Sequence, residues 1–98
     1  MYDEYKPRNA ICPKCGTELH HWQGKDGVNA LLVWQEGELS AIGQLVDEDC
    51  RMPVEKIKKI RLPDEFVIYS CDDGHRMIFA DCRTSLSVWN STEFDWQD

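Results

Sequence analysis

Two cysteines separated by two residues, Cys12 and Cys15, occur in the stretch Cys12-Pro13-Lys14-Cys15-Gly16. Two thiolates at this spacing can bind one metal ion from a single tight turn. Pro13 fixes one φ angle of such a turn, and Gly16 tolerates the positive φ with which the chain leaves it. The stretch therefore predicts either a metal site or a reactive pair of thiols.

A structural zinc site has four ligands, so Cys12 and Cys15 require two more. Cys71 and His75 are the best second pair, because Cys71 ends one expected strand and His75 begins the next. Gly74 permits a tight turn between them, so both side chains would project from one hairpin tip. We therefore expect one structural Zn²⁺ bound by Cys12, Cys15, Cys71 and His75.

The identity of the fourth ligand stays open at this point. Cys82 is the chief rival to His75, although its distance from Cys71 along the expected hairpin argues against it. Adjacent residues of a strand point to opposite faces, so only one of two neighbouring histidines could reach the first turn. The further candidates are Asp72, Asp73, and one of His20 and His21.

The two segments together resemble zinc-ribbon proteins, whose metal lies between two hairpin turns of the rubredoxin type. The first turn, 12–16, matches the zinc knuckle of that family, whereas Cys71-Asp72-Asp73-Gly74-His75 has three intervening residues and ends in His instead of Cys. The resemblance covers about residues 9–21 and 66–82. It implies a structural metal, and it implies no particular function because members of the family differ widely in what they do.

A redox role for Cys12 and Cys15 is the alternative, since Cys-Pro-x-Cys also occurs in glutaredoxins. In those proteins the motif follows a strand and opens a helix, whose N-terminus lowers the pKa of the reactive thiol. Here Gly16 follows the motif at once, and residues 17–27 show no helical periodicity. The flanking sequence therefore favours metal binding.

Length and composition predict one folded domain over residues 1–98, with 42% hydrophobic residues. No apolar run approaches the roughly 20 residues that cross a bilayer, and the first residues lack the features of a signal peptide. We therefore expect a cytoplasmic protein whose five cysteines are reduced or bound to metal. A net charge of −7 makes binding to a phosphate backbone less favourable.

Short β-rich runs separated by turn residues predict a mainly β fold, a small α+β domain of two or three antiparallel hairpins. One hairpin is expected for residues 28–35 with 38–46, and another for 66–71 with 76–82. A short final strand should follow at 86–90, with an acidic tail behind it. Residues before the first cysteine are expected to be a loose arm or one short strand.

One short helix is expected from Pro53 to Arg61, because Val54, Ile57 and Ile60 recur every three residues. Pro53 suits a first-turn position of a helix. With the first hairpin, this helix would form an insertion at about 24–63 in the zinc-ribbon-like domain.

We find no phosphate-binding loop, Ser/His/Asp set or His-Glu-x-x-His helix in the sequence, so a non-enzymatic binding module is expected. Trp34 and Trp89 are expected in the core. Trp22 and Trp96 are less easily buried, and exposed Trp is enriched at interface hot spots. These features predict a protein–protein interaction or regulatory protein with an unidentified protein partner, without a membrane or small-molecule role. The alternative is a nucleic-acid-binding zinc ribbon that uses a local basic patch.

Overall fold

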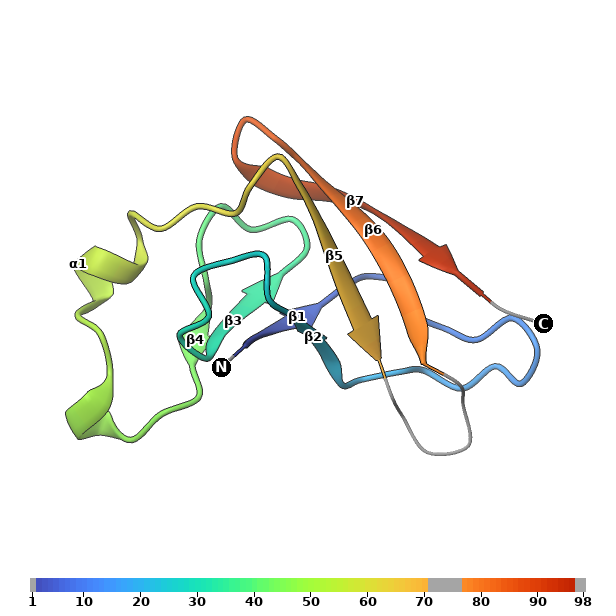
Figure 1. Ribbon diagram of the computed structural model, residues 1–98, viewed down its shortest axis with the longest axis horizontal. Helices are drawn as coiled ribbons and strands as arrows, with labels where there is room; N and C mark the ends of the chain where they lie inside the picture. The colour runs from blue at the N-terminus through green and yellow to red at the C-terminus, as the bar shows by residue number, and fades with distance from the viewer. Residues whose placement is uncertain (1, 71–76, 97–98) are drawn as a thin grey trace.

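Seven strands form one curled sheet in the computed structural model, which describes residues 2–70 and 77–96 (Figure 1). Their order across the sheet is β4-β3-β1-β2-β5-β6-β7, so the fold is mainly β as the sequence predicts. The strands are β1 Asp3–Lys6, β2 Trp22–Gly24, β3 Leu32–Gln35, β4 Gly43–Gln44, β5 Glu65–Ser70, β6 Ile78–Ser85 and β7 Val88–Asp95.

The expected hairpin at 66–82 is confirmed, because β5 pairs antiparallel with β6 along its whole length. The final strand differs from the prediction at both ends. Leu86 and Ser87 have positive φ angles of 52° and 68° and form the tight turn between β6 and β7. The strand therefore runs from Val88 to Asp95 instead of over 86–90, and it includes most of the residues predicted to form the acidic tail.

The first strand, β1, lies in the middle of the sheet and is not a loose arm. It pairs antiparallel with β2 and parallel with β3. Asp3 and Tyr5 point into the core with no exposed surface, while Lys6 is exposed. The buried carboxylate of Asp3 accepts hydrogen bonds from the N–H groups of Ala30 (2.9 Å) and Leu32 (3.1 Å) and from Trp34 Nε1 (3.1 Å). These bonds allow a charged residue to begin a core strand.

Aromatic side chains fill the concave interior of the sheet. The ring of Tyr5 lies 5.3 Å from that of Phe66 and 5.9 Å from that of Trp89, and the Phe66 and Trp89 rings are 5.4 Å apart. Trp34 and Trp89 are buried, which confirms their predicted place in the core. This aromatic cluster joins β1, β5 and β7 across the interior.

The stretch between β3 and β5 contains little regular structure. The predicted hairpin forms between β3 and the two-residue strand β4. The predicted helix over 53–61 is a single turn, α1 Val54–Ile57, preceded by a 3₁₀ turn, η1 Glu48–Cys50. Ile57 is buried and Ile60 packs against the core partly buried, whereas Val54 is exposed, so the expected apolar stripe is only partly covered. None of the described helices is long and apolar enough to cross a membrane.

Candidate functional site

The cysteine motif forms a narrow loop between β1 and β2, closed by backbone hydrogen bonds. The N–H of Cys12 donates to Thr17 O (2.9 Å), and the N–H of Gly16 donates to Cys12 O (2.8 Å). A third hydrogen bond flanks these two: the N–H of Leu19 donates to Ala10 O (2.8 Å). Gly16 has a φ of 70°, a conformation that glycine adopts without the steric cost of a Cβ. The motif therefore builds the tight turn that the sequence predicts, which we call the knuckle (residues 10–19).

The two thiols of the knuckle have different surroundings. Cys12 is buried, whereas Cys15 is exposed at the loop surface. The Cys15 thiol donates a hydrogen bond to Thr17 Oγ1 (3.2 Å). If Cys15 becomes a thiolate on binding a metal, the Thr17 hydroxyl can reverse the bond and donate to the sulfur. The chemistry of this turn fits half of a zinc site.

Cys71 and His75, the expected second pair of ligands, lie outside the described residues. Cys71 follows Ser70, the last residue of β5, which pairs with Trp22 at the start of β2. The Trp22 indole N–H in turn donates to Leu19 O in the knuckle (3.0 Å). The described end of β5 and the knuckle are therefore joined through Trp22 at one end of the sheet (Figure 1).

Cys82, the rival for the fourth position, lies in the middle of β6, opposite Phe66 of β5 and Thr92 of β7. It is four residues from the start of β6, or about 13 Å at about 3.3 Å per residue. Burial raises the pKa of the Cys82 thiol to about 12, Glu36 and Asp81 add to this, and a hydrogen bond with Thr92 offsets part of the rise. Its position in the middle of a strand, about 13 Å from the start of β6, argues against Cys82 as the fourth ligand.

Within residues 2–70 and 77–96, no group of three or more His, Cys, Asp or Glu side chains is arranged to hold a metal ion. Of the four predicted ligands, Cys12 and Cys15 lie in the described part of the chain, both in the knuckle. Cys50, the remaining described cysteine, is exposed in η1.

The two tryptophans expected to contact a partner belong to one aromatic row beside the knuckle. Trp22 is completely buried, so the expectation that it is exposed is wrong. Its ring lies 5.3 Å from that of Phe94, and the ring of Trp96 stacks on Phe94 at 5.1 Å. Trp96 is half-buried, so of the two tryptophans only Trp96 is partly accessible. The contact of Phe94 with both tryptophans could not be predicted from the sequence, because it requires β7 to extend as far as Asp95.

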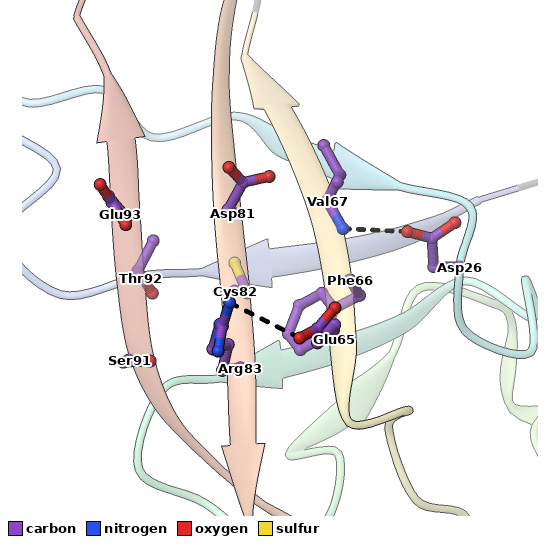
Figure 2. A pocket seen from close by; sticks show the side chains of 10 residues that line it. All are labelled: Asp26, Glu65, Phe66, Val67, Asp81, Cys82, Arg83, Ser91, Thr92 and Glu93. Atoms are coloured by element: carbon purple, nitrogen blue, oxygen red, sulfur yellow. Dashed lines mark hydrogen bonds and ion pairs between the residues drawn. The ribbon is translucent and has the colours of Figure 1, made fainter.

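Acidic side chains surround a hollow of about 540 Å³ over β5, β6 and β7 (Figure 2). Asp81 and Glu93 are directly opposite one another on neighbouring strands, which is unfavourable for like charges. Arg83 forms an ion pair with Glu65 (3.6 Å), but both side chains are about 70% exposed, so the pair contributes little. This face repels anions. Along β6, exposed and buried residues alternate, and this alternation is the sequence signal that could have predicted the acidic face.

Four large apolar side chains between β3 and α1 are widely exposed. Their exposed fractions are 43% for Leu39, 49% for Ile42, 50% for Leu45 and 63% for Val54. They belong to the stretch that the sequence identifies as an insertion. Ile42, Leu45 and Val54 line one groove, so they offer apolar surface to another molecule.

Comparison of the chain with models of protein families, with curated proteins and with solved structures gives no match. What the geometry defines is a small, mainly β domain with a cysteine knuckle in the loop between β1 and β2 and exposed apolar side chains beside the edge strand β4.

Proposed function

We propose that this chain is a non-enzymatic protein-interaction module stabilised by one structural Zn²⁺, with Cys12, Cys15, Cys71 and His75 as ligands. The closed knuckle and its connection through Trp22 to the end of β5 support this ligand set. Zinc would tie the first hairpin turn to the segment that follows β5, and its binding energy would contribute to folding.

The exposed apolar side chains between β3 and α1 carry the proposal of a protein partner. Monomeric proteins rarely leave large contiguous apolar patches in water, and such patches commonly mark interaction sites. The described cysteine with a strongly perturbed pKa, Cys82, is held neutral in the core, which suits a structural role better than a nucleophilic one. These observations favour binding over catalysis.

Metal analysis of the purified protein tests the zinc part of the proposal. We expect one zinc per chain in the wild type, loss of zinc in Cys12→Ser, Cys15→Ser, Cys71→Ser and His75→Ala, and retention in the matched control Cys82→Ser. Chelation should lower the unfolding midpoint of the wild type. A native protein that folds without metal, or a Cys82→Ser variant that loses it, would contradict this ligand set.

A nucleic-acid-binding role is the second candidate, supported by exposed Lys56, Lys58 and Lys59 around α1. Arg61 is less available, because its guanidinium donates to the carbonyl oxygens of Lys58 and Ile60. Phosphate binding weakens steeply as salt rises. Affinity capture with and without nuclease, at low and moderate salt, distinguishes the candidates. We expect a stoichiometric protein partner that survives nuclease, and co-purified nucleic acid released by salt would refute the proposal.

A further inference from the structure

A groove of about 600 Å³ lies between the edge strand β4 and the α1 turn, and we call it the β4 groove. Three of its lining side chains, Ile42, Leu45 and Val54, are each about half exposed or more. Because β4 is the last strand on this side of the described sheet, one side of its backbone has no neighbouring strand (Figure 1). The groove therefore combines an apolar floor with an open sheet edge.

The charge of the β4 groove is opposite to that of the whole chain. Lys6, Arg51 and Lys58 line it, and its described lining contains neither Asp nor Glu. The chain has 18 acidic and 11 basic residues, so a purely basic lining departs from the average surface. The three cations come from β1, from the segment after η1 and from the end of α1, and the fold brings them together.

We propose that the β4 groove binds an acidic peptide segment of a partner protein. The apolar side chains of the segment would cover the floor, and its carboxylates would meet the three cations, as in other grooves that accept amphipathic segments. The proposal rests on the protein-binding function proposed above. Single-stranded nucleic acid fits less well, because such sites stack bases on aromatic side chains, and the described lining holds none.

Gly43, on the floor of the groove, offers a way to block the site without disturbing the fold. No described atom lies within 4 Å of a Cβ placed at Gly43, and its backbone is outside the positive-φ region that excludes larger residues. A Gly43→Leu substitution should therefore project a side chain into the open groove. Lys58→Glu removes one attraction at the rim, and Lys25→Glu, in the turn after β2, is the matched charge change away from the groove.

The test is selection of a displayed random peptide library on the full wild-type chain, with Gly43→Leu as counter-selection. Binding of the selected, fluorescein-labelled peptides is then measured by fluorescence polarisation. We expect sequences rich in Asp, Glu and aliphatic residues. Their affinity should fall at least about tenfold in Gly43→Leu and Lys58→Glu, a loss of about 1.4 kcal/mol, and stay unchanged in Lys25→Glu. Equal unfolding midpoints show that the variants fold.

Several results would overturn the inference: no enrichment, basic or neutral peptides, or peptides that bind Gly43→Leu as well as wild type. Competition by a single-stranded oligonucleotide would assign the groove to nucleic acid instead. Concentration-dependent self-association lost in Gly43→Leu would assign it to a second copy. If affinity capture finds a protein partner that Gly43→Leu retains fully, the groove inference fails and the proposed function stands. If wild type captures none, the proposed function fails by itself.

Discussion

The buried carboxylate of Asp3 provides the sharpest test of how this sheet is held together. Its Oδ1 accepts the backbone N–H groups of Ala30 and Leu32, and its Oδ2 accepts Trp34 Nε1. An Asp3→Asn substitution can keep the first oxygen as an acceptor. The new amide nitrogen then faces the Trp34 indole N–H, so two hydrogen-bond donors oppose each other in a fully buried site.

The expected loss of stability follows from this single replacement. A hydrogen bond to a charged group is worth about 1.5–3 kcal/mol, and a buried donor left unsatisfied costs a similar amount. We therefore expect Asp3→Asn to lower the free energy of unfolding by about 2–3 kcal/mol. For a domain whose total stability is roughly 5–15 kcal/mol, this is a large fraction. Trp34→Phe removes the donor, so in the double variant Asp3→Asn/Trp34→Phe the two donors no longer meet.

The free energies of unfolding of the wild type, the two single variants and the double variant are measured by urea titration followed by circular dichroism. Together they form a double-mutant cycle. The double variant should be more stable than the sum of the single losses predicts, by about 1–2 kcal/mol. A strictly additive cycle would show that Asp3 and Trp34 are not coupled. An Asp3→Asn protein within about 0.5 kcal/mol of wild type would refute the central role of this carboxylate.

Three further changes test other parts of the fold. Leu86→Asn with Ser87→Gly should raise the free energy of unfolding by about 1 kcal/mol in urea titrations, because both residues have positive φ, which Asn and Gly tolerate better. Gly16→Ala should lower zinc affinity and the thermal midpoint, since an Ala at φ 70° strains the knuckle by about 1 kcal/mol. The unfolded Cys82 thiol ionises near pH 8.5–9, whereas the folded one, with a pKa of about 12, stays neutral. Stability should therefore fall by roughly 1–2 kcal/mol from about pH 8 to pH 10 relative to Cys82→Ala.

Local patterns account for what the sequence predicts correctly. The knuckle is closed by contacts within residues 10–19, and the β5–β6 hairpin needs two apolar runs close together in the chain. Both features depend on neighbours within a short segment, so their residues reveal them. The burial of Trp34 and Trp89 follows in the same way from their positions inside β-rich runs.

Long-range partners explain the errors. Asp3 reads as a solvated residue until its three donors, all about thirty residues away, are known. The parallel pairing of β1 with β3 likewise joins distant segments. Trp22 reads as hard to bury because its indole N–H needs an acceptor, and Leu19 O supplies one only after the knuckle has closed. The expected helix is a single turn with an incomplete apolar stripe, because Ile57 and Ile60 pack against the core and Val54 remains exposed.

The central position of β1 connects the two proposed sites. Tyr5 pairs with Trp22 of β2 on the knuckle side and with Trp34 of β3 on the groove side. Lys6, the next residue, lines the β4 groove, and the knuckle begins only a few residues later at Ala10. Metal bound at the knuckle would therefore restrain the same strand that carries one cation of the groove. On this view a metal ion bound at the knuckle would also affect how well the groove is formed.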